Sequence, residues 1–143
     1  MKVKIIVFSQ TGNTRQIALS IANGILNKGA DLEVLDWMKI KDEPPENILR
    51  GCDLLGIGTP VFFYQLPFCI RDWLMKFPKV NEKPYFLFIT YAVVVGTTVR
   101  DADNILRKKG WKLIDNSGFL GFGSYQAYLP WPRLSVQFPD FMK

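Results

Sequence analysis

Hydroxyl and amide side chains are concentrated in one short segment near the start of the chain. The segment consists of Ser9, Gln10, Thr11, Gly12, Asn13 and Thr14. A strand-like apolar run over residues 3–8 precedes it, and an amphipathic helix-like run begins near Arg15. A strand, a hydroxyl-rich turn and a helix start form an anion site, because backbone N–H groups and the positive end of the helix dipole converge there. The segment is therefore predicted to bind a phosphate.

The spacing of glycine and lysine in this segment restricts the class of phosphate ligand that it could bind. No lysine follows Gly12, so the GxxxxGK[ST] loop of NTP-hydrolysing proteins is absent. The segment has one glycine, and Gly56 and Gly58 lie in a later strand without a third partner, so the dinucleotide fingerprint GxGxxG is absent too. A single terminal phosphate remains as the candidate ligand. The alternative is an ordinary capped turn, because Ser, Thr and Asn are preferred at helix N-caps.

The composition narrows the chemistry further. The chain has no histidine, which excludes Ser-His-Asp and Cys-His nucleophile systems and most transition-metal sites. Cys52 and Cys69 have no metal-ligand spacing, and most such cysteines are small core residues. We therefore predict no catalytic side chain and no metal site, and expect any chemistry to reside in a bound cofactor.

Length and hydropathy indicate the class of protein. With 143 residues, 48% of them hydrophobic, the whole chain fits one globular domain over residues 1–143. No apolar run reaches the length of a membrane span. The N-terminus enters a strand pattern without a signal-peptide h-region, so we expect a cytoplasmic protein.

Strand-like and helix-like segments alternate along the chain. Strands are expected over residues 3–8, 32–35, 53–59, 85–91 and 111–122. Helices are expected over residues 13–28, from Pro67 to about Phe77, and from Thr97 or Thr98 to Gly110, with at most a short helix in residues 37–50. This alternation predicts an α/β fold with a doubly wound, five-stranded parallel sheet in the order 2-1-3-4-5. Ligands would then bind beyond the carboxyl ends of strands one and three.

Two further loops must line such a site. One follows the third strand and the other the fourth; they contain Thr59, Pro60, Val61, Phe62, Phe63 and Tyr64, and Thr90, Tyr91, Ala92, residues 93–95 and Gly96. Both loops are aromatic or apolar and contain no acid, as the walls of a site for a planar apolar ligand require. The alternative is that these side chains simply belong to the core.

These segments resemble the flavodoxin family. SQTGNT is similar to the loop in which flavodoxins hold the phosphate of FMN, and TPVFFYQLP resembles a flavin-flanking loop, especially that of flavodoxin domains fused to ferredoxins. A TY pair followed five residues on by Gly96 also matches, and the resemblance spans residues 3–122. It implies FMN as the cofactor, with residues 9–14 on the phosphate and residues 59–64 and 90–96 on the ring. Residues 60–66 lack the glycine whose peptide often flips in this family.

Three functions are compatible with these segments. The first is an FMN-binding electron-transfer protein that passes electrons between redox partners, and the short loops favour it. The second is an FMN-dependent oxidoreductase acting on a small molecule such as a quinone or a porphyrin precursor, which usually needs a longer loop and an open ring face. The third is a flavin-free interaction or receiver domain on the same scaffold. A phospho-receiver would need clustered acids at the end of the first strand, where residues 8–10 have none.

The charge distribution suggests a partner. The formal net charge is +5, unlike the acidic surfaces usual in flavodoxins, and seven of the thirteen acids lie between Asp31 and Asp53. The second half is basic, through Arg71, Lys76, Lys79, Lys83, Arg100, Arg107, Lys108, Lys109 and Lys112. We expect an acidic, ferredoxin-like redox partner to dock near the flavin edge, the alternative being solvated helix faces. Nucleic-acid binding is not expected, because the lysines are dispersed.

The end of the sequence departs from a typical flavodoxin. Residues 124–143 contain Pro130, Pro132 and Pro139, which would break a final helix. We therefore expect an irregular tail rich in aromatic residues and proline. The sheet face that the helix would cover still needs a partner, so we predict either a strap formed by the tail or a homo-oligomer through the tail, and favour the oligomer.

Overall fold

The fold is a five-stranded parallel sheet in the order β2-β1-β3-β4-β5, as the sequence predicts. This was established from a computed structural model that describes residues 1–121. The strands are β1 (Lys2–Val7), β2 (Asp31–Asp36), β3 (Leu54–Pro60), β4 (Lys83–Tyr91) and β5 (Trp111–Leu120). The predictions for residues 124–143, namely the missing final helix, the strap and the subunit contact, fall outside the described part of the chain.

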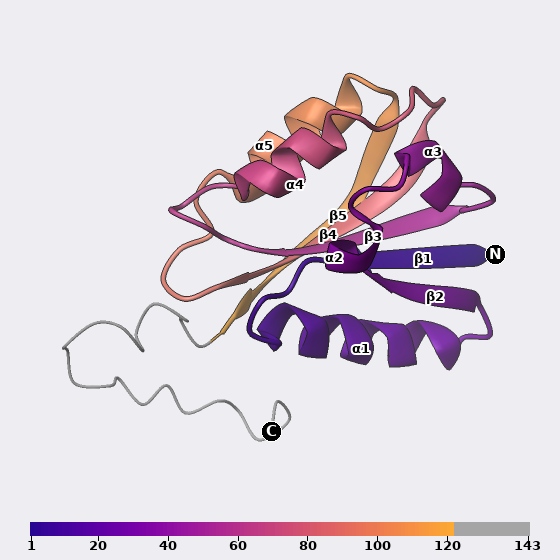
Figure 1. Cartoon of the computed structure of the whole chain (residues 1–143). Helices are drawn as coiled ribbons and strands as arrows, with labels where there is room; N and C mark the ends of the chain where they lie inside the picture. The colour runs from indigo at the N-terminus through magenta and orange to yellow at the C-terminus, as the bar shows by residue number, and fades with distance from the viewer. Residues whose placement is uncertain (122–143) are drawn as a thin grey trace.

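Helices cover both faces of the sheet (Figure 1). They are α1 (Asn13–Leu26), α2 (Trp37–Ile40), α3 (Pro45–Ile48), α4 (Phe68–Leu74) and α5 (Thr98–Arg107). Within residues 1–121, α1 lies on one face, and α4 and α5 lie on the other together with the two short helices. None of these helices is long and apolar enough to cross a membrane.

The predicted boundaries shift by a few residues. The helix expected to reach Phe77 ends at Leu74, because the chain tightens into turns in which the Lys76 N–H donates to the Trp73 carbonyl at 3.0 Å. The expected core position of Cys69 is wrong, since Cys69 is exposed whereas Cys52 is buried. The buried side of α4 is formed by Ile70, Trp73 and Leu74, and residue 69 lies off that side.

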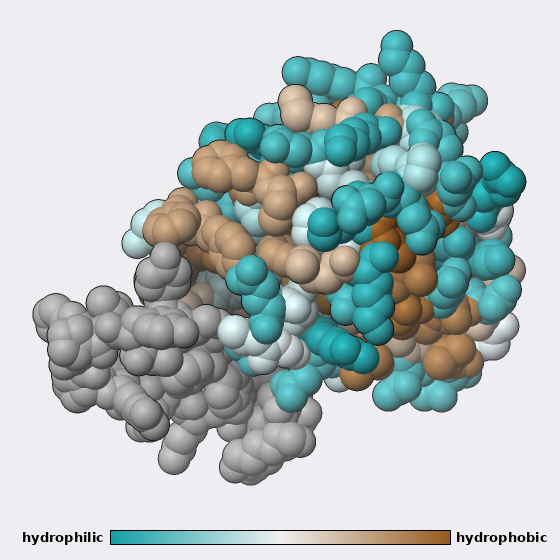
Figure 2. Space-filling model, viewed as in Figure 1, coloured by the Kyte–Doolittle hydropathy of each residue, from teal (hydrophilic) through white to brown (hydrophobic). Residues whose placement is uncertain are grey.

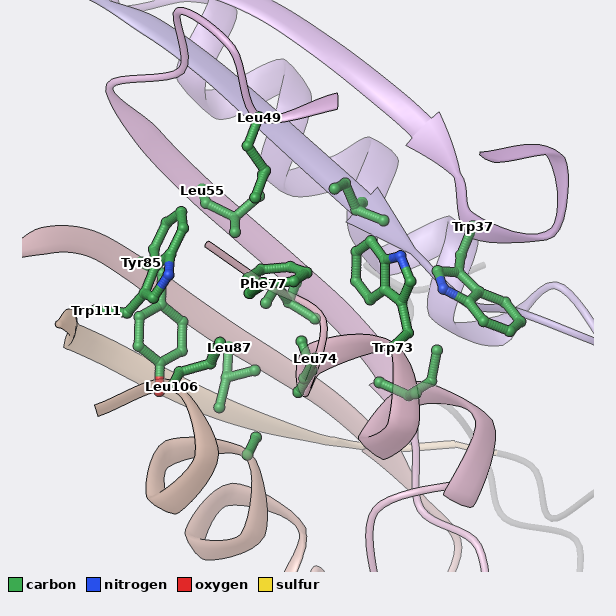
Figure 3. Close-up of a cluster of buried hydrophobic side chains, with 14 of the residues drawn as sticks. Trp37, Leu49, Leu55, Trp73, Leu74, Phe77, Tyr85, Leu87, Leu106 and Trp111 are labelled. Atoms are coloured by element: carbon green, nitrogen blue, oxygen red, sulfur yellow. The ribbon is translucent and has the colours of Figure 1, made fainter. Parts of the chain in front are cut away.

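An aromatic cluster fills the space between the sheet and α4 and α5. Figure 3 shows its members: Trp37 begins α2, Trp73 lies in α4, Phe77 follows α4, and Tyr85 and Trp111 lie in β4 and β5. Trp73 lies between Trp37 and Phe77, at ring-centroid distances of 6.3 Å and 4.7 Å, and Phe77 continues to Trp111 at 5.6 Å. The two contacts of Trp73 are edge-on, a geometry that aromatic pairs prefer, and the Phe77–Trp111 pair is tilted, so the cluster fixes α4 against the sheet.

The α1 face of the sheet is built differently. Val3, Ile5 and Val7 of β1 pack under α1, and farther along the sheet Phe86 and Phe88 lie on the same face. The two phenylalanine rings lie over Gly56 and Gly58 so closely that a Cβ at either glycine would overlap the ring. These glycines therefore make room for aromatic side chains. Among the described residues, α1 is the one helix on this face. Phe88 is buried there, whereas Phe86 is half-buried.

Candidate functional site

The three predicted loops meet at the carboxyl ends of β1, β3 and β4. The Phe8 N–H donates to the Gly58 carbonyl at 2.9 Å, which holds the start of the phosphate loop (residues 9–14) against β3. The Val61 N–H donates to the Thr90 carbonyl at 3.0 Å, which joins the first ring loop (residues 59–64) to the second (residues 90–96). Parallel strands place their carboxyl ends at one edge, so segments distant in sequence form one site.

The phosphate loop leads directly into α1. Gly12 has a φ of +96°, a left-handed conformation that favours glycine, and no described atom lies within 4 Å of the position its Cβ would take. The Ser9 hydroxyl accepts hydrogen bonds from the N–H groups of Gly12 at 3.1 Å and Arg15 at 3.3 Å. The first turn of α1 contains no acid, and it carries Arg15. Since helix N-termini favour negative charge, this turn is suited to an anion supplied from outside the chain.

A buried pair of hydroxyls connects the phosphate loop to β4. Thr14 Oγ1 lies 2.7 Å from Thr90 Oγ1, and both residues are buried. Thr14 is in the first turn of α1, and Thr90 immediately precedes Tyr91 at the end of β4. The bond therefore links the predicted phosphate-binding and ring-binding segments.

The first ring loop contains an unusually tight turn. Phe62 and Gln65 exchange two backbone hydrogen bonds, of 3.1 Å and 3.0 Å, around Phe63 and Tyr64. The central residues have φ values of +49° and +65°. Positive φ at both positions is the signature of a type I′ turn, where Asn and Gly are the usual residues. Two aromatic residues thus occupy strained backbone positions, and strain of this kind is concentrated at functional sites.

The second ring loop packs against this turn. Gly96 has a φ of +61° and contacts the Tyr64 carbonyl so closely that a Cβ at residue 96 would overlap it. The next N–H, that of Thr97, donates to the same carbonyl at 2.8 Å. The Thr97 hydroxyl donates to Asp101 Oδ2 at 2.6 Å, so a carboxylate lies at the start of α5, beside a loop that itself has no acid. The two ring loops form one connected unit.

Apolar side chains are exposed around this unit. Phe63 is 71% exposed, Tyr64 65% and Val93 73%, and Val94 and Phe68 are also exposed. Figure 2 shows hydrophobic residues at the surface over the end of the sheet where these loops lie. The Arg71 guanidinium lies over the Phe68 ring, 4.7 Å from its centroid. An exposed apolar group of this kind is typical of a ligand or partner contact.

The remaining predicted residues divide between surface and core. Gln10, Thr11 and Ala92 are exposed, whereas Gly12, Asn13, Pro60, Val61 and Tyr91 are half-buried. Thr59 is buried, its hydroxyl donating to the Pro60 carbonyl at 3.1 Å. Phe62 packs edge-on against Phe8 at a ring-centroid distance of 5.9 Å. The two predicted ring-loop residues Thr59 and Phe62 thus support the loop from within.

Two parts of the site were missed in the sequence. Gly121 follows β5, donates its N–H to the Tyr91 carbonyl at 2.8 Å, and lies beside the Asn13 side chain. Trp37 begins α2 and packs edge-on against Phe8 at 5.2 Å, where it supports the strand end before the phosphate loop. Both residues directly follow the carboxyl end of a parallel strand, and this position in the sequence could have indicated that they lie at the site.

Most of the basic residues lie at the opposite end of the sheet from the loops. The end of α5 and the segments leading into β4 and β5 carry Lys76, Lys79, Lys83, Arg107, Lys108, Lys109 and Lys112. A pocket of about 460 Å³ lies there, lined by both charge signs through Glu82, Asp103, Arg107 and Lys112. At the site end, the corresponding cations are Arg71 and Arg100, together with Arg15 of α1. The positive charge of the second half is therefore mostly remote from the candidate site.

Comparison with known proteins identifies the fold. No protein-family model matches the sequence, and no curated protein matches it significantly. Among solved structures, two-electron reduced flavodoxin from Megasphaera elsdenii is similar, with a TM-score of 0.71 at 23% identity over 81% of this chain and 84% of that one. Flavodoxin 1 from Bacillus cereus has a TM-score of 0.68 at 22% identity, covering 85% and 87%. A flavone reductase has a TM-score of 0.70 at 17% identity, and the match covers 84% of this chain and 54% of the reductase. The chain has the flavodoxin-like fold.

Proposed function

We propose that this protein binds FMN through the three loops and functions as an electron carrier. The observation that carries the proposal is the connected geometry of the site. A helix N-terminus without an acid adjoins hydroxyl side chains, and the Thr14–Thr90 bond joins it to loops bearing exposed aromatic residues. Phosphate donors next to exposed apolar side chains are the combination that FMN requires.

The donor set fits a single phosphate group. Ser9, Thr11 and Thr14 supply hydroxyls, and the start of α1 supplies N–H groups that have no partner within the helix. Arg15 adds a positive charge, and residues 9–15 contain no lysine of the kind that contacts a triphosphate. The ring would lie between the residue 62–65 turn and the second ring loop, with Phe63, Tyr64 and Tyr91 as apolar walls. When bound, the flavin supplies one-electron or two-electron transfer.

The carrier function is supported over the oxidoreductase by loop length. The segment from Pro60 to Leu66 forms one two-residue turn and then leads into α4, which leaves little chain to enclose a small substrate. The oxidoreductase remains the alternative, acting on a quinone or a porphyrin precursor. Turnover of the FMN-loaded protein with quinones, compared with reduction of a one-electron protein acceptor, separates the two. Fast reduction of the protein acceptor with negligible quinone turnover is expected, and the reverse result would favour the enzyme.

The partner is proposed to be an acidic, ferredoxin-like redox protein. Its docking near the flavin edge is supported by Arg15, Arg71 and Arg100 and by the exposed apolar residues between them, because opposite charge accelerates encounter. The cluster of cations at the other end is too distant to orient such a partner by direct contact. Charge reversal at Arg71 and Arg100 should therefore slow electron transfer more than the same change at Lys108 and Lys112.

A homo-oligomer through residues 124–143 and a cytoplasmic location complete the proposal. The half-buried Phe86 and the single described helix on the α1 face support a further cover for that face. Light scattering of the full chain should report an oligomer that dissociates or aggregates when residues 124–143 are removed. A monodisperse monomer before and after truncation would remove the idea.

A further inference from the structure

We propose that Thr90 positions Thr14 for phosphate binding, and that this pair couples the phosphate loop to both ring loops. The inference rests on the proposed FMN site and assigns to Thr90 a role distinct from contact with the ring. Its starting point is a single bond between residues 76 positions apart in the sequence.

The surroundings of the bond fix its geometry. The two hydroxyl oxygens are 2.7 Å apart, and the residues are 2% and 6% exposed. Thr14 shares the buried side of α1 with Ala18 and Ala22, which hold the helix against the sheet. Each hydroxyl is a hydrogen-bond partner of the other, as buried polar groups require.

The direction of the bond follows from the ligand. A threonine hydroxyl donates one proton and accepts through two lone pairs, whereas a phosphate monoester at neutral pH is mainly an acceptor. If Thr14 donates its proton to a phosphate oxygen, the proton between the two threonines must come from Thr90. The chain of donors then runs from Thr90 to Thr14 to phosphate, and each bond in such a chain strengthens the next.

Thr90 also holds the first ring loop. Its carbonyl accepts the Val61 N–H at 3.0 Å, and it pairs with Pro60 in the register between β3 and β4. Tyr91 of the second ring loop is its neighbour in sequence. Thr90 therefore contacts the phosphate loop through its hydroxyl and the first ring loop through its carbonyl, and it begins the second ring loop. Removal of the hydroxyl alone leaves these backbone connections in place, so its effect should fall on the phosphate loop.

The test measures FMN and riboflavin affinities of the full chain by calorimetry. The variants are Thr90→Val, which removes the hydroxyl at nearly constant shape, Thr90→Ser, which retains it, and Thr98→Val as a control. Thr98 is buried at the start of α5, and its hydroxyl has no partner among the described residues. Thr90→Val should weaken the affinity for FMN about 3- to 10-fold and the affinity for riboflavin by less than about 2-fold. Thr90→Ser should keep the FMN affinity near that of the wild type, and Thr98→Val should change the affinity for neither ligand.

A double variant isolates the coupling. The Thr14→Val variant has no hydroxyl at residue 14 for Thr90 to orient. Adding Thr90→Val to it should therefore reduce the affinity for FMN no further. Equal losses of FMN and riboflavin affinity in Thr90→Val would overturn the proposal, because they would reveal a purely structural pair while leaving the FMN site intact. Wild-type protein that binds FMN and riboflavin equally would overturn the phosphate site and this proposal with it. If Thr90→Val does not fold, Thr90→Ala provides the second hydroxyl-free variant.

Discussion

Gly96 contacts the carbonyl of Tyr64 backbone to backbone, and no side chain separates the two ring loops at that point. The contact requires a residue without a Cβ, and the φ of +61° at Gly96 independently favours glycine. The Thr97 N–H donates to the same carbonyl, so the contact and the hydrogen bond together set the spacing of the loops.

Gly96→Ala should separate the ring loops. We expect a loss of about 2 kcal/mol or more in the free energy of unfolding, because the variant combines left-handed strain with steric overlap. Gly24→Ala is the matched control, since Gly24 lies within α1 with no described atom within 4 Å of its Cβ position. That change should stabilise the protein by about 0.5–1 kcal/mol. Denaturant unfolding measures both, and equal effects of the two variants would contradict the close contact.

Replacing Tyr64 by glycine should stabilise the unliganded protein and weaken FMN binding. Relief of the left-handed strain at a φ of +65° should raise the free energy of unfolding by about 1 kcal/mol. The variant also lacks the exposed aromatic side chain that is proposed to contact the flavin ring. Glu82 provides the control, because it is exposed, has a φ of +49° and lies at the opposite end of the sheet. Glu82→Gly should stabilise the fold without changing FMN affinity. Unchanged FMN binding in Tyr64→Gly would show that the turn does not contact the ring.

Gly58 should resist substitution because of packing. A Cβ at this residue would overlap the Phe88 ring, so Gly58→Ala is expected to cost about 1–3 kcal/mol of unfolding free energy. Shortening the ring in Phe88→Leu should relieve that overlap, so the double variant should lose less than the two single losses combined. Strict additivity in this double-mutant cycle would disprove the proposed contact.

The Tyr85 hydroxyl gives the stability a predictable pH dependence. It donates to Asp103 Oδ1 at 2.9 Å, and burial together with this bond raises the pKa of Tyr85 well above its usual value of about 10. The folded state therefore retains the proton while the unfolded state loses it, and the stabilisation present at lower pH declines as pH rises above about 10. Tyr85→Phe should cost about 1–3 kcal/mol at pH 8. The difference from wild type should narrow at pH 10.5, and a constant difference would contradict the raised pKa.

The fold was predictable from sequence because its signals are local. Apolar runs such as YFLFIT indicate strands, and helical periodicity between them, bounded by residues such as Pro67 and Gly110, indicates helices. This alternation predicts a doubly wound domain and its strand order. The turn over residues 9–12 and the start of α1 were predictable for the same reason, since the strand, the glycine and the helix start are nearly consecutive in the sequence. Helix ends were less accurate, because the last turn of α4 is decided by tertiary packing.

The connections between the loops were not predictable. A turn with Phe63 and Tyr64 at positive φ contradicts local preferences and forms because Gly96 and the backbone of Thr97 hold it from a distant segment. The Thr14–Thr90 bond and the position of Gly121 beside Asn13 likewise depend on contacts across the sheet. The basic residues looked like one surface in sequence, yet the topology divides them between the two ends of the strands.

The most direct test of the account is the relative affinity of wild-type protein for FMN and riboflavin, which differ by the phosphate alone. Hydrogen bonds to a charged group contribute about 1.5–3 kcal/mol each, and about 1.4 kcal/mol corresponds to a tenfold change in affinity. We therefore expect FMN to bind at least about tenfold more tightly than riboflavin, and Thr14→Val to reduce that preference. Equal affinities in the wild-type protein would contradict the assignment of residues 9–14 as a phosphate site.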